Sequence, residues 1–312
     1  MTPTQHHEHG IHTIDAGYLR PGLASIHLIA QAGHAALVDT GTRHSVPHIL
    51  ATLAELGMGP EAVDYVIATH VHLDHAGAAG ALLAACPNAR LVVHPKGARH
   101  LIDPARLVAG SLAVYGEALF RRLYGDIIPA PAERVIEADD GHRIDFHGRA
   151  LTFIDTPGHA RHHFCVHDSA SNSIFTGDTF GISYREFDVE GRPFIFPTTT
   201  PVQFEPEALH ASIDRLLALN PDAAYLTHYG RVTNLATLDG QLHTLIDEFV
   251  RLTCAVEEEG VARHGALKSS IETCLLDAAR AHGCSLETEH MRELLASDVE
   301  LNTQGLLAWR DK

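Results

Sequence analysis

The sequence predicts an α/β fold with a helical extension at its C-terminal end, and three observations support this class. Short apolar runs alternate with helix-like segments over roughly the first 95 residues, as expected of an α/β protein. Residues 134–179 then contain several short strand-like runs separated by turn residues. After residue 230 the composition shifts to helix-forming residues divided by glycines. A chain of 312 residues has ample length to bury a core.

The first part of the chain reads as alternating strands and helices. Two strands are joined by a tight turn at Ala32 and Gly33, and Pro47 lies in the first turn of the helix that follows. The spacing of apolar residues predicts these elements in order: strand 23–31, strand 34–40, helix 45–57, strand 62–69, helix 78–85 and strand 90–95.

Residues 96–131 depart from this alternation and form a predicted insertion. Residues 96–102 are expected to make one or two helical turns, and residues 112–124 place apolar side chains on one face of a longer helix. The insertion can lie over a functional site or pack on the exterior of the core. The sequence leaves these two alternatives open.

The later part of the chain is predicted as a meander followed by helices. The expected strands are 134–137, 143–146, 150–155, 163–167 and 173–176. An irregular, aromatic segment, 180–206, precedes a helix from Glu205 and a strand that ends at His228. Three C-terminal helices are expected at 235–259, 266–282 and 286–296. We therefore expect a catalytic domain over 1–233 and a helical region over 234–312.

Composition limits the classes of function. A formal net charge of −16 argues against a broad nucleic-acid interface, which requires basic clusters. The first ten residues lack the basic and apolar regions of a signal peptide, and no run is long enough to span a membrane. The five cysteines have no metal-binding spacing. We expect a cytoplasmic protein that acts on a small molecule and binds no membrane, with homo-oligomer formation left open.

One stretch carries most of the chemistry. His70, His72, Asp74 and His75 supply three imidazoles and a carboxylate within six residues. The apolar residues before them predict a buried strand and the Ala/Leu-rich residues after them predict a helix, so the four side chains lie in a loop at a strand end. Nitrogen and oxygen donors of this kind suit zinc. Because the loop bends between His72 and Asp74, it can supply ligands to two ions.

This motif, His-x-His-x-Asp-His, resembles the signature of the metallo-β-lactamase-fold superfamily, on the glyoxalase II-like and lactonase-like side. The resemblance covers roughly residues 23–231 and implies an αββα sandwich. It also implies three further ligands in the Thr-Pro-Gly-His, Thr-Gly-Asp and Thr-His sequences that end at His159, Asp178 and His228. By this resemblance one ion is held by His70, His72 and His159, the other by Asp74, His75 and His228, and Asp178 bridges them.

The resemblance implies a metal-dependent hydrolase. Its two divalent ions, zinc with iron or manganese as alternatives, would hold a hydroxide that cleaves a small ester, lactone, thioester or related bond. Asp74 would bind metal through one oxygen and use the other to orient the hydroxide or accept a proton. An iron-dependent oxidoreductase of the persulfide dioxygenase type is the alternative, ahead of a nuclease or an inactive scaffold.

Several other residues are assigned roles around this centre. Tyr184 and Arg185 follow Asp178 closely and are predicted to contact substrate, Tyr184 by donating to a developing oxyanion and Arg185 by binding an anion. The alternative is that both pack their loop or pair with nearby acidic residues. The resemblance gives Asp39 a supporting role behind the ligands. His162, His163 and His94 are expected to have structural roles rather than to bind metal.

Overall fold

The computed structural model describes residues 4–199 and 202–312. By its internal contacts the chain divides into two compact units. The sheet unit consists of Met1–Asp155, His162–Gly177 and Pro221–Thr233. The helical unit consists of Thr156–Arg161, Asp178–Asn220 and Asn234–Lys312. Each unit is therefore discontinuous in sequence, and the domain boundary expected at 233/234 stays a prediction.

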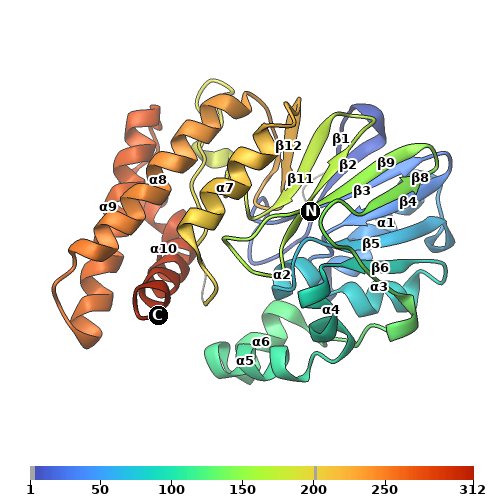
Figure 1. Cartoon of the computed structure of the whole chain (residues 1–312), viewed down its shortest axis with the longest axis horizontal. Helices are drawn as coiled ribbons and strands as arrows, with labels where there is room; N and C mark the ends of the chain where they lie inside the picture. The colour runs from blue at the N-terminus through green and yellow to red at the C-terminus, as the bar shows by residue number, and fades with distance from the viewer. Residues whose placement is uncertain (1–3, 200–201) are drawn as a thin grey trace. The chain divides into compact units, whose positions relative to one another are not determined.

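The first sheet of the sheet unit has seven strands in sequence order (Figure 1). Strands β1 to β4 pair antiparallel, whereas β4 to β7 pair parallel. Ala32 and Gly33, both with positive φ, form the predicted turn between β3 and β4. The strands are β1 Gln5–His6, β2 Ile11–Asp15, β3 Ser25–Gln31, β4 His34–Val38, β5 Val63–Ala68, β6 Arg90–Val93 and β7 Val135–Glu137.

Two features of this sheet differ from the sequence-based expectation. Strands β1 and β2 both lie outside the expected elements. In β2 the polar residues His12, Thr13 and Asp15 are buried and hide the apolar pattern of a core strand. Strand β7 was expected in the meander, but it pairs with β6 in the first sheet. The insertion thus acts as the long crossover that a parallel pair of strands requires.

The second sheet has six strands in the order β13-β12-β11-β10-β9-β8. All its pairs are antiparallel except β11 with β12. This exception follows from the chain path, because a long excursion separates β11 from β12 whereas turns join the other strands. The strands are β8 Arg143–Phe146, β9 Arg149–Asp155, β10 Phe164–Asp168, β11 Ser173–Gly177, β12 Ala223–Leu226 and β13 Gly230–Val232.

The core of the sheet unit contains apolar side chains from strands of both sheets. Ile29 and Ile67 of the first sheet belong to the same buried cluster as Phe153, Phe164 and Phe175 of the second. Phe153 and Phe164 meet edge to face, with ring centroids 4.9 Å apart. Burying each such side chain contributes about 1.5–3 kcal/mol. The expected α/β architecture with two packed sheets is confirmed.

Three helices of the sheet unit contact the first sheet: α1 packs on β2, α3 on β5 and β6, and α4 on β7, whereas α5 packs on α4 and α6 (Figure 1). The insertion contains three helices, and the single helix expected at 112–124 is instead divided at Gly116, whose φ of 71° interrupts helical geometry. The helices are α1 Val46–Glu55, α2 Leu73–Ala76, α3 Ala79–Ala85, α4 Pro95–Ile102, α5 Ala105–Tyr115 and α6 Glu117–Tyr124.

The helical unit contains α7 Pro206–Leu217, α8 Leu235–Ala255, α9 Gly260–His282 and α10 Thr288–Arg310, drawn from yellow to red in Figure 1. The expected break at Gly265 is wrong, because α9 runs through it. The last helix extends well beyond residue 296. Its apolar pattern fades there because Asp298 and Asn302 are buried and hydrogen-bonded to Tyr184 and Thr199. Helix formation continues through these polar positions.

Within residues 4–199 and 202–312, no helix is both long enough and apolar enough to cross a bilayer.

A buried histidine makes the stability of the sheet unit depend on pH. His27 in β3 is 1% exposed, its Nε2 donates to the Leu226 carbonyl at 3.0 Å, and its Nδ1 lies 3.2 Å from Thr13 Oγ1. Burial lowers the pKa of His27 from 6.5 to about 4. Because the unfolded chain takes up this proton near pH 6.5 and the folded chain only near pH 4, acid favours unfolding.

We predict that this group removes about 2 kcal/mol of stability between pH 7.5 and pH 5. The variant His27→Gln keeps an N–H for Leu226 but does not titrate, so its free energy of unfolding should fall less over this range. Urea unfolding at both pH values measures the difference. His290→Gln, which changes an exposed histidine of α10, is the control. Equal pH dependence in wild type and His27→Gln would contradict the prediction.

Candidate metal centre

The predicted motif lies at the expected strand end: His70 and His72 are in the loop between β5 and α2, and Asp74 and His75 lie in α2 itself. His70 is fully buried, and its Nε2 lies 2.9 Å from Nδ1 of His72. Its Nδ1 lies 3.2 Å from Thr69 Oγ1. Because the Thr69 hydroxyl donates its hydrogen to Asp39, Oγ1 serves as an acceptor for His70 Nδ1–H. The Nε2 lone pair of His70 is then directed toward His72.

Asp39 follows β4 and is the group on which the loop depends. Its carboxylate is fully buried and accepts hydrogen bonds from the Thr69 backbone N–H at 2.9 Å and the Thr69 hydroxyl at 2.8 Å. It also accepts from the Thr227 hydroxyl at 2.6 Å and from His75 Nδ1 at 2.8 Å. Asp39 thus joins the ends of β4, β5 and β12, and it contacts a predicted ligand without being one itself.

A second group of predicted ligands, Asp74, His75 and His228, also lies within the sheet unit. Their ligand atoms all lie within 4.8 Å of one another. Nε2 of His75 is 3.7 Å from Asp74 Oδ2, and Nε2 of His228 is 3.4 Å from the same oxygen. The structure therefore brings together a carboxylate and two imidazoles that are separated by more than 150 residues in sequence.

Hydrogen bonds to the other ring nitrogens define which atoms face the centre. His75 Nδ1 contacts the Asp39 carboxylate, and His228 Nδ1 lies 2.9 Å from the Leu23 carbonyl oxygen. Both oxygens can only accept, so each Nδ1 carries the hydrogen. In the neutral tautomer Nε2 then carries a lone pair. Two nitrogen lone pairs and one carboxylate oxygen converge, which is an arrangement that suits a cation.

The alternative is that both rings are doubly protonated and pair with Asp74 as imidazolium ions. The ring centroids of His75 and His228 are 5.2 Å apart, and the two residues are 0% and 5% exposed. Two positive charges this close and this buried would carry a large desolvation cost with one carboxylate to compensate. A divalent ion bound by neutral rings avoids that cost.

The helical unit shows the same pattern at His159 and Asp178. His159 Nδ1 lies 3.3 Å from the Thr198 carbonyl oxygen, so the hydrogen is on Nδ1 and the Nε2 lone pair faces Asp178 Oδ2 at 3.5 Å. Asp178 directly follows Gly177, the last residue of β11. A Cβ at Gly177 would lie 2.6 Å from Thr69 Oγ1, so only glycine fits before this aspartate.

The histidines that were not expected to bind metal have structural contacts. His163 is fully buried, and its ring stacks on that of His70 with centroids 4.9 Å apart. The ring of His162 lies parallel to that of His70, with centroids 6.3 Å apart. His94 accepts a hydrogen bond from the Lys96 backbone N–H at the start of α4, and its Nε2 lies 3.0 Å from Asp155. His94 therefore caps a helix.

Tyr184 and Arg185 have protein partners within the helical unit. The Tyr184 side chain is 1% exposed, and its hydroxyl donates to both oxygens of Asp298 at 3.1 Å. Arg185 donates to the Ser183 carbonyl at 2.7 Å and pairs with Asp188 at 3.3 Å. These contacts favour the alternative in which both side chains pack their segment. The catalytic roles predicted for Tyr184 and Arg185 stay predictions.

Three tyrosines near Asp74 were not singled out by the sequence. The hydroxyls of Tyr18 and Tyr124 are 3.2 Å apart, and the Tyr115 ring packs on Tyr124 with centroids 5.8 Å apart. Burial and the Asp74 carboxylate raise the pKa of Tyr18, and burial, Tyr18 and Asp74 raise that of Tyr124. Tyr115 and Tyr124 belong to the insertion. The Asp74 carboxylate acts electrostatically on the hydroxyls of Tyr115 and Tyr124, which favours the first of the two expected placements of the insertion.

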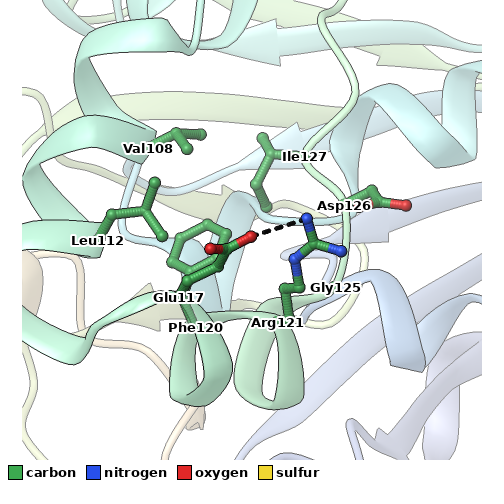
Figure 2. Close-up of a pocket in the computed structure, with 8 residues that line it drawn as sticks. All are labelled: Val108, Leu112, Glu117, Phe120, Arg121, Gly125, Asp126 and Ile127. Carbon is green, nitrogen blue, oxygen red and sulfur yellow. Dashed lines mark ion pairs between the residues drawn. The ribbon is translucent and has the colours of Figure 1, made fainter.

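The insertion also contains an open cavity of about 390 Å³ (Figure 2). Figure 2 shows a charged edge, where Glu117 and Arg121 of α6 form an ion pair at 2.9 Å. Both side chains are largely exposed, so this pair contributes little to stability. The apolar part of the wall is formed by Val108, Leu112, Phe120 and Ile127. The cavity lining includes none of the predicted metal ligands.

Comparison with known proteins gives consistent results. Residues 19–228 match the family profile described as the Metallo-beta-lactamase superfamily. The chain is 29% identical to metallo-beta-lactamase fold-containing protein ST1585 of Sulfurisphaera tokodaii, over 72% of this chain and 80% of that protein. It is 31% identical to a hydroxyacylglutathione hydrolase of Aeromonas hydrophila, over 67% of this chain but only 63% of that enzyme.

Solved structures show the same fold. An archaeal metallo-beta-lactamase superfamily protein, ST1585 from Sulfolobus tokodaii, superposes with a TM-score of 0.65 at 23% identity and covers 97% of this chain and 99% of its own. A metallo-beta-lactamase family protein from Thermus thermophilus also gives a TM-score of 0.65, at 22% identity, with 92% and 93% coverage. On its sequence and its fold, this chain belongs to the metallo-beta-lactamase superfamily.

Proposed function

We propose that this protein is a hydrolase that uses two divalent metal ions, zinc in the first instance, to cleave a small ester, lactone, thioester or related bond. The superfamily implies a metal-dependent hydrolase, and histidine and aspartate clusters that could hold metal are present. We propose zinc as the metal and the bonds named above as the substrate class. Imidazole nitrogen and carboxylate oxygen are the donors that zinc accepts.

The observation that carries the proposal is the direction of the ring nitrogens. In His75, His228 and His159 the Nδ1 hydrogen is donated to an oxygen that can only accept, so each Nε2 lone pair faces a carboxylate. Acceptors that converge in this way are typical of a metal site in which outer hydrogen bonds orient the ligands. Hydrogen bonds from these three Nε2 atoms to the carboxylates would instead require a hydrogen on Nε2.

The proposed ligand set is the one predicted from the sequence. Chain continuity supports the inclusion of its two members from the helical unit, since Thr156–Arg161 joins the end of β9 to the residues before β10, and Asp178 directly follows β11. The proposed ligands are His70, His72 and His159 for one ion, Asp74, His75 and His228 for the other, and Asp178 for both.

Ions bound there would lower the pKa of coordinated water toward neutrality and polarise the substrate carbonyl. Asp74 directs Oδ2 toward His75 and His228, and we assign its other oxygen to orient the attacking water and accept its proton. Tyr18 and Tyr124 keep their protons, because burial raises both pKa values. One of the two hydroxyls donates to the other, so one hydroxyl hydrogen is left to donate to a substrate near Asp74.

The hydroxyacylglutathione hydrolase relative supports thioesters as one candidate substrate class. The helical unit gives little support for binding of an acidic glutathione-like group by basic side chains. Several of its basic side chains are already paired with carboxylates of the same unit, namely Arg251, Arg263, Lys268 and Arg292. The proposed substrate class therefore includes small esters, lactones and thioesters, without a specified acyl group or leaving group.

The first prediction from the proposed function is that protein purified without chelator contains about two zinc ions per chain and hydrolyses at least one member of a panel of esters, lactones and thioesters. Elemental analysis and the panel measure this. Asp178→Ala should remove most of the activity and one ion, whereas His162→Ala, which changes a neighbouring histidine outside the ligand set, should retain both ions.

Other outcomes would contradict this proposal in distinct ways. A single tightly bound iron with no hydrolysis would favour the oxidoreductase of the persulfide dioxygenase type. Equal loss of metal in Asp178→Ala and His162→Ala would mean that the ligand assignment is wrong. Removal of metal by chelator with activity retained would exclude a metal-dependent mechanism.

The second prediction concerns the support of the ligands by Asp39. An asparagine at this position cannot accept from all four donors, so His75 loses the partner that fixes its tautomer. We expect Asp39→Asn to weaken metal binding or activity about 10–100-fold. The matched control is Asp155→Asn, because Asp155 also pairs with a histidine, His94, outside the ligand set. Unchanged metal affinity in Asp39→Asn would contradict the role assigned to this carboxylate.

The third prediction concerns the tyrosine hydroxyls. Tyr124→Phe removes the hydroxyl that lies 3.2 Å from that of Tyr18 while keeping the packed ring. We expect kcat to fall about tenfold or more with unchanged metal content, because a hydrogen-bond donor near the reacting group is lost. The same kinetics on Tyr184→Phe and Arg185→Ala test the roles predicted for those residues. Wild-type kcat in Tyr124→Phe would show that the pair has a packing role alone.

A further inference from the structure

A second cluster of possible ligands lies in the sheet unit away from the candidate metal centre. It consists of His34, the first residue of β4, Asp64 near the start of β5, and His147 in the turn between β8 and β9. Strands β4 and β5 are parallel, and Asp39 and His70 follow their other ends. At roughly 3.3 Å per residue, the two clusters are separated by about the length of these strands.

The three side chains converge closely. Asp64 Oδ2 lies 3.0 Å from His34 Nδ1 and 2.6 Å from His147 Nε2. The two imidazole rings stack with centroids 3.8 Å apart and planes inclined by 22°. One ligand atom from each residue lies within 4.8 Å of the other two. Two nitrogens and one oxygen therefore surround a common point.

Hydrogen bonding does not account for the whole of this arrangement. His34 Nδ1 is buried and makes no hydrogen bond, because the 3.0 Å approach of Asp64 Oδ2 lacks the required direction. A buried nitrogen that faces the cluster without a hydrogen bond is an independent sign of a missing ligand. Stacked rings at 3.8 Å would also repel each other if both carried a positive charge.

We propose that His34, Asp64 and His147 form an additional site for a divalent transition metal such as zinc. Two imidazole nitrogens and a carboxylate oxygen are a suitable donor set, with the remaining positions taken by water. Ligand atoms about 2.0–2.2 Å from a tetrahedral ion lie roughly 3.3–3.6 Å from one another. The two nitrogens that now lie 3.0 and 2.6 Å from Asp64 Oδ2 would therefore move slightly away from that oxygen when an ion binds between them.

The position of this site indicates a structural role. His34 and Asp64 belong to the first sheet, whereas His147 belongs to the hairpin of β8 and β9 in the second sheet. An ion bound by all three would cross-link the two sheets at one edge of the core. An open depression of about 650 Å³, lined in part by Gly33, His34 and Glu61, adjoins the cluster and gives an ion access from solvent.

Zinc titration of the protein already loaded at its main centre tests this proposal. The variants are His34→Gln and His147→Asn, the second chosen because asparagine tolerates the positive φ of 52° at this turn. His167→Gln, which changes a histidine of β10 outside the cluster, is the control. Circular dichroism checks that all four proteins are folded.

We expect wild type and His167→Gln to bind one more zinc ion per chain than either variant, or to bind it at least tenfold more tightly. The extra ion should raise the Tm of wild type and leave that of both variants unchanged, and hydrolysis at the main centre should be unaffected. Equal zinc stoichiometry and affinity in all four proteins would overturn the proposal and leave the cluster as a set of ordinary side-chain contacts.

Discussion

The buried carboxylate of Asp39 is the constraint on which the candidate metal centre depends. A carboxylate with no exposed surface is costly unless donors surround it, and Asp39 has four, from Thr69, Thr227 and His75. These donors follow β5 and β12 and lie in α2, so satisfying one charge requires elements from both sheets to meet. The packing of the apolar core holds the two sheets together, and the carboxylate aligns their ends.

The same hydrogen bonds prepare the chemistry. Asp39 accepts a hydrogen bond from His75 Nδ1 and another from the Thr69 hydroxyl. Because the Thr69 hydrogen is used in this way, Thr69 Oγ1 accepts a hydrogen bond from His70 Nδ1. The Leu23 carbonyl oxygen likewise accepts a hydrogen bond from His228 Nδ1. Each ring is thereby held in the tautomer that presents a nitrogen lone pair to its neighbours. These hydrogen bonds hold the proposed ligands in orientations that suit metal binding.

The sequence predicts those features of the fold and the candidate site that appear as local residue patterns. The segment from His70 to His75 is recognisable because four candidate ligands interrupt an apolar strand and helix, and most strands follow from short apolar runs. Residues that act through tertiary contacts are not visible in this way: nothing local marks Tyr18 as a partner of Tyr124 or the Leu23 carbonyl as an acceptor for His228. The sheet to which β7 belongs, and the length of α10, depend likewise on packing rather than on periodicity.

Histidine and aspartate residues lie near both ends of strands β4 and β5, and the two ends differ in how deeply these side chains are buried. At the carboxyl ends, Asp39, His70 and His75 are fully buried, so charges there interact strongly and hold fixed positions. At the amino ends, the His34 and Asp64 side chains are 41% and 24% exposed, and water weakens the field of any ion bound there. The same donor types therefore lie in a fully buried environment at the carboxyl ends and in a partly hydrated one at the amino ends.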